Sequence, residues 1–253
     1  MNILSVKNLT FSYDNKRNIL NGIDFSIKKG TITAFLGKNG SGKSTLLDNI
    51  IGVHSVQEDT IYICDKDLSK LSPTERSRLV AYVPQSSTVN MDFTVFEYIL
   101  FGRNCHIPFG KAPSKEDYDK VYYYAEACGI TGLLDKDVNK ISGGEKQLAC
   151  IARALTQESS IIIMDEPTAS LDFGNQAKIL NLMISLKNDG KTIMFTTHNP
   201  NYLLDIDCEV VILSEGKILK SGRACETIDV EVLKAIYGEF VLESCSRHFS
   251  YKV

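Results

Sequence analysis

The sequence predicts an α/β fold built around a parallel β-sheet. Three continuous apolar runs have the length and composition of strands buried on both faces: residues 31–36, 161–164 and 192–197. The first run leads into a glycine-rich loop, the second into two carboxylates and the third into a histidine. Because the carboxyl ends of parallel strands meet at one edge of a sheet, we expect these polar residues to lie along that edge.

The glycine-rich loop matches the phosphate-binding pattern G-x-x-x-x-G-K-[ST] in full. Its residues are Gly37, Lys38, Asn39, Gly40, Ser41, Gly42, Lys43, Ser44 and Thr45. Glycines let backbone N–H groups turn toward an anion, and a helix beginning near Lys43 adds the positive end of its dipole. Lys43 can reach the β- and γ-phosphates, the Ser44 hydroxyl can bind Mg²⁺, and Thr45 adds a second hydroxyl. The loop therefore predicts binding of a nucleoside triphosphate.

The residues that end the other strands suit phosphate hydrolysis. Asp165 is placed to hold Mg²⁺, directly or through water, and Glu166 to orient or deprotonate the attacking water. His198 can hydrogen-bond the γ-phosphate. Gln85 follows a further predicted strand, 79–83, where it could bind a metal or sense a phosphate, although most glutamines at strand ends have no such role.

A second phosphate-binding device is predicted in the segment 141–147, ISGGEKQ, which we call the signature segment. Ser142 and Glu145 form a capping box at the start of a helix. Gly143 and Gly144 would then stand in its first turn, where each glycine costs roughly 1 kcal/mol relative to alanine. Close approach of the backbone to a ligand is the usual reason for that cost, so this helix start is a candidate phosphate site.

The remaining elements follow from shorter patterns. Strands are predicted at 3–10, 20–27 and 60–64, helices from Pro73 and at 229–237, and a hairpin over 209–219. Residues 94–155 are predicted to be mainly helical, because capping boxes begin at Thr94 and Ser114. Within that segment Tyr118 and Tyr122 are expected in the core rather than as a stacking platform for nucleic acid. Near the first turn, Tyr13 could stack on adenine or pack against the sheet.

Composition argues against several classes of protein. With 28 basic and 31 acidic residues among 253, the net charge is −3, so no basic excess points to nucleic acid. No run approaches the roughly 18 consecutive apolar residues of a membrane-spanning helix. The seven cysteines include no C-x-x-C pair, and we expect small buried apolar residues rather than disulfides or zinc ligands. The histidines at 54, 106 and 248 are expected to be solvated or structural.

In their order along the chain, these segments resemble the ATP-binding subunit of ABC transporters over essentially the whole sequence. Residues 37–45 look like Walker A, the signature segment is similar to LSGGQ, and Asp165-Glu166 resembles Walker B with its catalytic glutamate. By the same resemblance Tyr13 corresponds to the adenine-stacking aromatic and Gln85 to the Q-loop. Further along, Ser170-Leu171-Asp172 corresponds to the D-loop, in which Asp172 lies near nucleotide, and His198 to the switch histidine.

The resemblance implies a P-loop NTPase (RecA-like) core with an N-terminal antiparallel β subdomain and an inserted helical subdomain. One ATPase domain would span 1–253. Residues 1–85 would hold the β subdomain and P-loop core, 86–155 the helical subdomain, and 156–253 the rest of the core with the C-terminal segment. ATP and Mg²⁺ would be the cofactors, with Lys43, Gln85, Glu166 and His198 serving catalysis.

A finer resemblance lies in Phe101-Gly102-Arg103-Asn104-Cys105-His106 followed by Pro108-Phe109-Gly110, which looks like importers of large metal chelates. That subfamily serves iron–siderophores, haem, cobalamin and, in one branch, molybdate. It usually shows G-R-x-P-H, so Cys105 replaces a proline here. Glu145 replaces the glutamine of LSGGQ and puts a charge near the nucleotide.

For assembly, the resemblance implies a head-to-tail homodimer that docks on an integral-membrane permease, with a substrate-binding protein as an indirect partner. Each ATP would lie between Walker A of one copy and Ser142 to Glu145 of the other. The chain would then sit as a peripheral subunit on the cytoplasmic face of the inner membrane. Another importer or exporter class remains an alternative. A soluble ABC ATPase of DNA repair or translation is less favoured, because those proteins usually carry a long coiled-coil insertion or fused halves.

Overall fold

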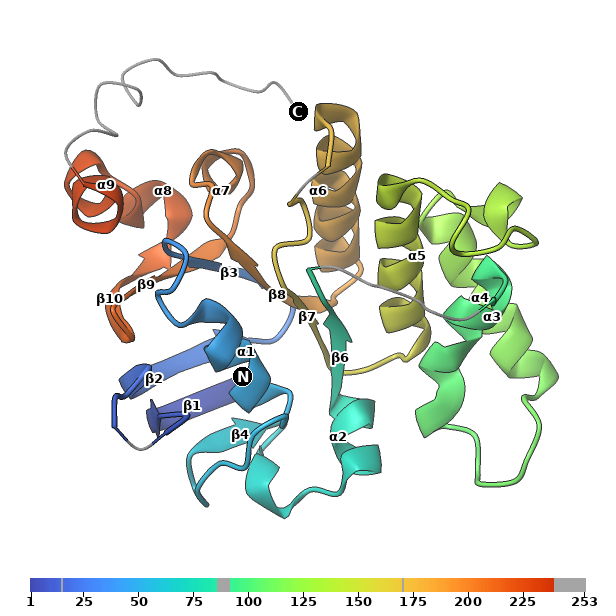
Figure 1. The fold of residues 1–253 in the computed structure, drawn as a ribbon, viewed down its shortest axis with the longest axis horizontal. Coiled ribbons are helices and arrows are strands. Elements are labelled where there is room, and N and C mark those ends of the chain that lie inside the picture. The colour runs from blue at the N-terminus through green and yellow to red at the C-terminus, as the bar shows by residue number, and fades with distance from the viewer. Residues whose placement is uncertain (15, 86–91, 170, 239–253) are drawn as a thin grey trace.

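The computed structural model describes residues 1–14, 16–85, 92–169 and 171–238. Its main sheet has five parallel strands and one antiparallel edge strand. Across this sheet the order is β10 (Lys217–Arg223), β9 (Glu209–Ser214), β3 (Ile32–Leu36), β8 (Thr192–Thr197), β7 (Ile161–Met164) and β6 (Val80–Val83). Figure 1 shows this sheet running through the middle of the molecule.

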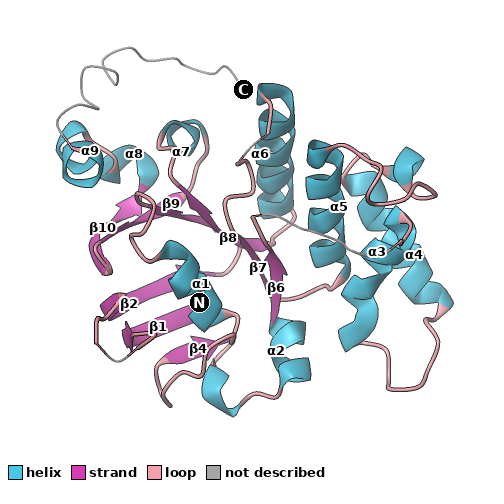
Figure 2. Ribbon diagram, viewed as in Figure 1, coloured by secondary structure: helices cyan, strands magenta, loops and turns pink. Residues whose placement is uncertain are grey.

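A second, antiparallel sheet lies beside the first and is formed mainly by the N-terminal part of the chain (Figure 2). Its strands, in order, are β2 (Leu20–Lys28), β1 (Asn2–Phe11), β4 (Ile61–Ile63) and β5 (Lys66–Asp67). The predicted strands at 3–10, 20–27 and 60–64 are thus confirmed to within a few residues. The fold class predicted from the sequence, an α/β core with an antiparallel β part and a helical part, is also confirmed.

Helices cover both faces of the main sheet, and a group of them forms a separate lobe (Figures 1 and 2). The lobe contains α3 (Val95–Leu100), the 3₁₀ helices η2 (Phe101–Cys105) and η3 (Thr131–Leu133), α4 (Lys115–Ala127) and α5 (Gly143–Thr156). The other helices are α1 (Lys43–Ile50), η1 (Leu68–Lys70), α2 (Pro73–Leu79), α6 (Phe173–Asn188), α7 (Asn201–Asp205), α8 (Ala224–Thr227) and α9 (Val230–Tyr237). None of the helices in the described ranges is both long and apolar enough to cross a membrane.

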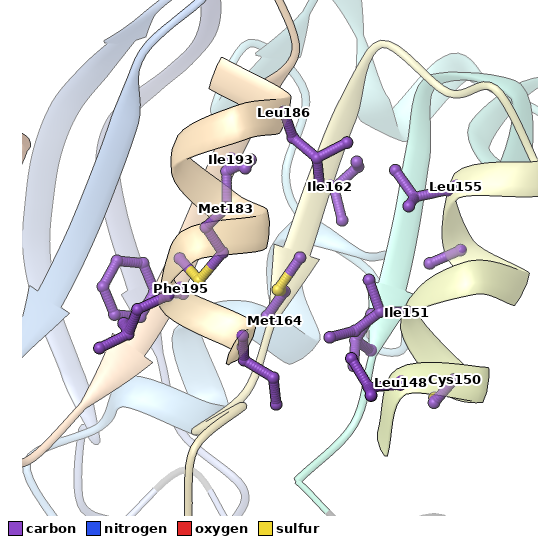
Figure 3. Close-up of a cluster of buried hydrophobic side chains, with 14 of the residues drawn as sticks. Leu148, Cys150, Ile151, Leu155, Ile162, Met164, Met183, Leu186, Ile193 and Phe195 are labelled. Atoms are coloured by element: carbon purple, nitrogen blue, oxygen red, sulfur yellow. The ribbon is translucent and has the colours of Figure 1, made fainter. Parts of the chain in front are cut away.

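The apolar runs are continuous because each parallel strand of the main sheet contributes to two cores. In β7, Ile162 and Met164 face the core shared with α5 and α6, whereas Ile161 and Ile163 face the core shared with α1 and the antiparallel sheet. Figure 3 shows the first core, with Phe195 of β8 lying near the side chains of α6. The carboxyl ends of the strands are therefore held firmly from both sides.

Local helix signals were predicted accurately. The predicted capping boxes that begin at Thr94, Ser114 and Ser142 are all present. In each, the serine or threonine side-chain oxygen accepts a hydrogen bond from the backbone N–H of the third residue that follows. Gly129 follows the C-cap residue of α4 and has a positive φ of +67°, the conformation in which glycine commonly ends a helix.

Two expectations about burial were wrong in part. Tyr118 and Tyr122 are 39% and 54% exposed, and the buried tyrosine of α4 is Tyr124, at 6%. Helical spacing shows which residues share a face; here both tyrosine rings contact Phe96 and keep a large part of their surface exposed. Among the described cysteines, those at 128, 150 and 208 are buried as expected, whereas Cys225 is exposed.

Candidate functional site

The glycine-rich loop encloses the ammonium group of Lys43. The Lys43 Nζ donates hydrogen bonds to the carbonyl oxygens of Gly37, at 2.7 Å, and Lys38, at 3.1 Å. Gly42 caps α1 with a φ of +104°, and a Cβ there would lie 3.0 Å from Leu20, so only glycine fits without strain. Burial lowers the pKa of Lys43, and the nearby carboxylates of the site oppose that shift.

The two carboxylates that follow β7 are held by a threonine of the neighbouring strand. The Thr196 hydroxyl donates to Asp165 Oδ1 at 2.5 Å and accepts the N–H of Glu166 at 2.8 Å. The other oxygen of Asp165 accepts from Ser44 Oγ at 3.2 Å, which joins the carboxylate to the start of α1. Glu166 has a φ of +43°, a strained conformation for a residue with a side chain, and such strain is often found at active sites.

Three predicted residues from separate parts of the chain converge on the side chain of Glu166. Oε2 of Glu166 lies 3.0 Å from His198 Nδ1 and 3.5 Å from Gln85 Nε2, and Oε1 lies 3.9 Å from Lys43 Nζ. The Glu166 side chain is 11% exposed and that of His198 is 55% exposed. A cavity of about 360 Å³ opens beside them, lined also by Asn39 of the glycine-rich loop.

The structure also places Tyr13 against the start of α1. Its hydroxyl lies 3.2 Å from Thr45 Oγ1, and its ring, which is 61% exposed, meets the rings of Phe11 and His54 edge-on. His54 in turn stacks on Phe11 at 4.6 Å, a structural role of the kind expected for it. Tyr13 therefore offers an open aromatic face next to the glycine-rich loop.

The signature segment lies at the start of α5 and does not line the cavity of about 360 Å³ beside Glu166 and His198. Ser142 and Glu145 bond to one another, and the backbone hydrogen bond from Ser142 lowers the pKa of Glu145. A Cβ on Gly144 would lie 2.5 Å from Nδ2 of Asn175 in α6, so this glycine has a packing reason within the chain. Gly143 is exposed, and a Cβ there would meet no atom of the described part of the chain within 4 Å.

The segment after the carboxylates is held by Asp172, which the resemblance placed near nucleotide, and by side chains that the sequence did not single out. Asp172 caps α6, accepting hydrogen bonds from the backbone N–H and side-chain amide of Asn175 at 2.9 and 2.8 Å. Gln176 donates to the carbonyl of Leu171 at 2.9 Å and accepts from the Tyr202 hydroxyl at 2.8 Å. Position 170, the first residue of the predicted D-loop, lies outside the described residues.

Sequence reasoning missed Thr196, although its role is clear from the geometry. A buried threonine in a β-strand is ordinarily a packing residue, so its type carries no functional signal. Its position does carry one: it ends up beside Asp165 only because β8 pairs with β7 in parallel register, with Phe195 opposite Met164. That register cannot be read from either strand alone.

A larger cavity, of about 620 Å³, lies where the helical lobe meets the main sheet. Its walls are residues 51–53 after α1, Arg76 and Ser77 of α2, Val80 and Tyr82 of β6, Phe101 and Gly102 of η2, and Arg153 and Gln157 at the end of α5. The lining combines apolar side chains with two arginines. We call it the lobe cavity.

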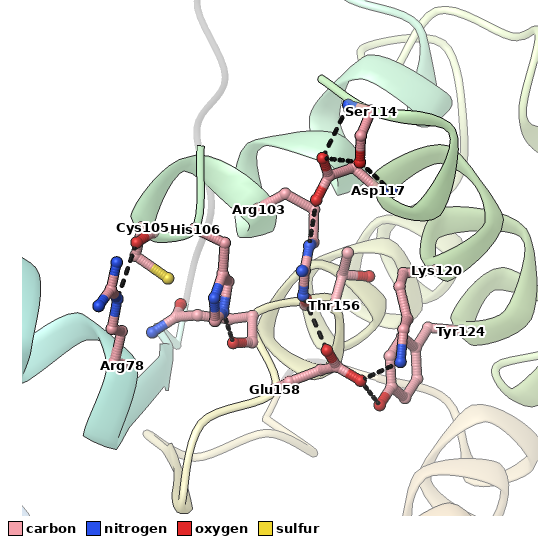
Figure 4. A network of polar contacts seen from close by, with 11 residues as sticks. Arg78, Arg103, Cys105, His106, Ser114, Asp117, Lys120, Tyr124, Thr156 and Glu158 are labelled. Carbon is pink, nitrogen blue, oxygen red and sulfur yellow. Dashed lines mark hydrogen bonds and ion pairs between the residues drawn. The ribbon is translucent and has the colours of Figure 1, made fainter. Parts of the chain in front are cut away.

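A buried ion-pair network holds the η2 wall of the lobe cavity in place. Figure 4 shows the Arg103 guanidinium between the carboxylates of Asp117 and Glu158, at 2.8 and 2.9 Å, and Arg103 also donates to the carbonyl of Thr156. Burial alone would raise the pKa of Asp117, but hydrogen bonds from Ser114 and Arg103 outweigh it and lower the pKa to about 2.

Nearby, backbone carbonyls also receive side-chain hydrogen bonds. The His106 ring lies 2.9 Å from the carbonyl oxygen of Gln157, and the Gln157 amide donates to the carbonyls of Ser77 and Val80. Together these contacts join η2, α4 and the end of α5 to the core.

Comparison with known proteins agrees with this arrangement. The family model described as ABC transporter matches residues 20–169, and a shorter match, to an AAA domain, covers residues 135–205. A protein of Helicobacter pylori described as a probable iron chelatin transport ATP-binding protein is 32% identical, over 93% of this chain and 92% of its own. A molybdate import ATP-binding protein of Haemophilus influenzae is 33% identical, over 92% of this chain and 87% of its own.

Among solved structures, an inward-facing transporter described as metal-chelate type matches with a TM-score of 0.82 and 32% identity. The match covers 93% of this chain and 88% of that one. Similarity of this extent, together with the complete set of motifs, identifies the family. This chain is therefore a member of the ABC transporter family, an ATP-binding cassette of the kind that hydrolyses ATP to drive transport.

Proposed function

We propose that this chain is the ATP-hydrolysing subunit of a membrane importer for metal chelates or for a molybdate-type oxyanion. The observation that carries the proposal is the convergence of Lys43, Gln85 and His198 on the Glu166 carboxylate, beside one open cavity. A carboxylate with a cation and two polar side chains around it can position and deprotonate an attacking water. The cavity gives room for that water and for a γ-phosphate.

Each residue of the site has a role that follows from its contacts. Lys43 is bonded to carbonyls of its own loop, and the β- and γ-phosphates of ATP would take over those contacts. Glu166 accepts the proton of the attacking water, while Gln85 and His198 orient the water and the γ-phosphate. Tyr13 presents its exposed ring to the adenine.

The residues around Asp165 fit Mg²⁺. Ser44 Oγ and Asp165 Oδ2 are hard oxygen donors 3.2 Å apart, and Gln85, whose amide nitrogen lies 3.5 Å from Glu166, would offer its side-chain oxygen as a further ligand. Magnesium bound there with ATP would neutralise charge on the β- and γ-phosphate oxygens. Thr196 contributes by holding Oδ1 of Asp165, so that Oδ2 is directed toward Ser44.

A head-to-tail homodimer accounts for the exposed signature segment. Gly143 has no packing reason among the described residues, because none of them lies within 4 Å of the place a Cβ would occupy. The open N-terminus of the 14-residue helix α5 attracts anions. We infer that Ser142, Gly143, Gly144 and Glu145, with Asp172 beside them, approach the triphosphate held by the loop of a second copy. ATP would close the dimer, and hydrolysis would reopen it.

The lobe cavity is the proposed docking site for the permease. Its size suits a short helix, and its apolar walls with Arg76 and Arg153 favour a segment that carries apolar residues and a carboxylate. Docking there would hold the subunit at the cytoplasmic face of the inner membrane. A substrate-binding protein would then be an indirect partner.

The proposed class of cargo rests on the similarity to iron-chelate and molybdate proteins over most of the chain. The ATPase of another importer or an exporter is the runner-up.

The test is a capture experiment with the Glu166→Gln variant, which should bind ATP and stay closed. Tagged Glu166→Gln is purified from detergent-solubilised native membranes with ATP present, and its partners are identified by mass spectrometry. Lys43→Ala, which should not bind ATP, is the matched control. Recovery of a polytopic permease would support the importer, and its identity would narrow the cargo. Recovery of soluble or nucleic-acid partners alone would contradict the proposal.

A further inference from the structure

The C-terminal helix α9 reaches the proposed hydrolytic site through one phenol group. Tyr237, the last residue of α9, donates a hydrogen bond from its hydroxyl to the backbone carbonyl of His198, at 2.5 Å. His198 stands directly after β8, so this bond joins two elements from distant parts of the chain. None of the motifs discussed above includes Tyr237.

The scaffold that carries this phenol is well anchored. Asp229 caps α9 by accepting the N–H of Val232 at 2.8 Å, and it is itself bonded to Lys220 at 2.9 Å. Val232, Leu233 and Ile236 are 8%, 8% and 3% exposed, and Val232 and Ile236 belong to the core of the main sheet. The Tyr237 ring also packs against that core. The hydroxyl therefore sits at a defined place rather than on a loose tail.

His198 needs such an anchor, because its own side chain is weakly held. The side chain is 55% exposed, and among the described residues its polar contact is the one to Glu166 Oε2 at 3.0 Å. On the backbone, the following N–H, of Asn199, bonds to the Thr197 hydroxyl at 3.1 Å. The bond from Tyr237 thus fixes the carbonyl side of the His198–Asn199 peptide group. It thereby also restricts the orientation of the His198 side chain.

We propose that Tyr237 is a positioning residue for His198, so that α9 forms part of the hydrolytic centre. The proposal rests on the function assigned to His198 above. A small rotation of the peptide after His198 would move its ring away from Glu166 and from the γ-phosphate, and small misplacements at a reacting centre are costly. Burial, with a further contribution from Glu166, raises the pKa of Tyr237 to about 12, so the phenol keeps its donor proton at neutral pH.

The experiment is a double-mutant cycle on the full-length chain, measuring ATP turnover, KM for ATP and Tm. The single variants are Tyr237→Phe and His198→Ala, and the third is their combination. Tyr62→Phe is the matched control, because it removes a phenol hydrogen bond of the same 2.5 Å length, to Asp59, in the antiparallel sheet. Loss of one such bond should lower kcat by about 3- to 10-fold with KM unchanged. In the His198→Ala background, Tyr237→Phe should then change nothing.

The outcomes separate the two levels of inference. An equal loss from Tyr237→Phe in both backgrounds, or a loss matched by Tyr62→Phe, would show a purely structural role and overturn the proposal. Wild-type turnover of Tyr237→Phe beside a slow His198→Ala would also overturn it, while leaving the proposed function intact. If His198→Ala itself hydrolyses ATP at the wild-type rate, the role assigned to His198 fails.

Discussion

Replacing Thr196 by valine tests the geometry around the two carboxylates. The Thr196 side chain is fully buried, and its hydroxyl bonds at once to Asp165 Oδ1 and to the N–H of Glu166. Valine keeps the shape and removes the hydroxyl, so both bonds are lost with little change in packing. The expected loss is about 3 kcal/mol in the free energy of unfolding, since a hydrogen bond to a charged group contributes about 1.5–3 kcal/mol and an orphaned buried amide costs about 1–3 kcal/mol.

That loss corresponds to a fall in Tm of about 6–12 °C, because 1 kcal/mol shifts the Tm of a chain of this size by about 2–4 °C. ATP turnover, measured well below the lowered Tm, should fall at least about tenfold as the carboxylates lose a positional restraint. Thr196→Ser retains the hydroxyl and should stay close to the wild type.

Thr192→Val is the matched control on the same strand. Thr192 is also buried, and its hydroxyl accepts the N–H of Gly30 at 3.0 Å, at the opposite end of β8 from the carboxylates. It should lower the Tm without changing turnover per folded molecule. Normal turnover in folded Thr196→Val, or an equal loss of turnover in Thr192→Val, would refute the reasoning.

Other parts of the site give further predictions. Glu166→Gln should slow hydrolysis by roughly 10²–10⁴-fold with ATP affinity retained, as single-turnover and nucleotide-binding assays would show; near-normal turnover would remove Glu166 from its role. Gly144→Ala should lower the Tm through its clash within the chain. Gly143→Ala should keep or slightly raise the Tm, because alanine is the better helix former, but should weaken ATP-driven dimerisation in light scattering; unimpaired dimers would argue against the shared site. Arg103→Met should destabilise by about 3–5 kcal/mol in denaturant unfolding, because the buried Asp117 carboxylate loses its cationic partner; a wild-type midpoint would contradict this. Since the pKa of Asp117 is depressed to about 2 in the folded protein, its contribution is present above its ordinary pKa of 3.8 and is lost as the pH falls through 2. Acid unfolding of Asp117→Asn should show less dependence on pH in that window.

The local chemistry of this fold was predictable from short stretches of sequence. The conformation of the glycine-rich loop can be predicted from its own residues, and capping boxes such as Ser114 with Asp117 involve residues three positions apart. Continuous apolar runs such as 161–164 predicted buried strands correctly, because a strand covered on both faces has no polar side to reveal.

What could not be predicted depends on the order of strands in space. Gln85 and His198 reach the same carboxylate only because β6, β7 and β8 are neighbours in the sheet. The exposure of Tyr122, whose ring contacts Phe96 of α3, depends on how α3 and α4 pack against each other. Neither the strand order nor this packing can be inferred from residues that are neighbours along the chain.

The length of α5 has a mechanical consequence. Its 14 residues span about 21 Å, with the signature segment at one end and Arg153 and Gln157, which line the lobe cavity, near the other. A helix this short behaves as a stiff rod, and a tilt of about 3° at one end displaces the other by about 1 Å. In the proposed assembly, a permease that displaces the lobe-cavity end of α5 would also displace the signature segment, which contacts the γ-phosphate held in the partner subunit. The same rod would carry closure of the nucleotide site back to the membrane, so force travels along one lever in both directions.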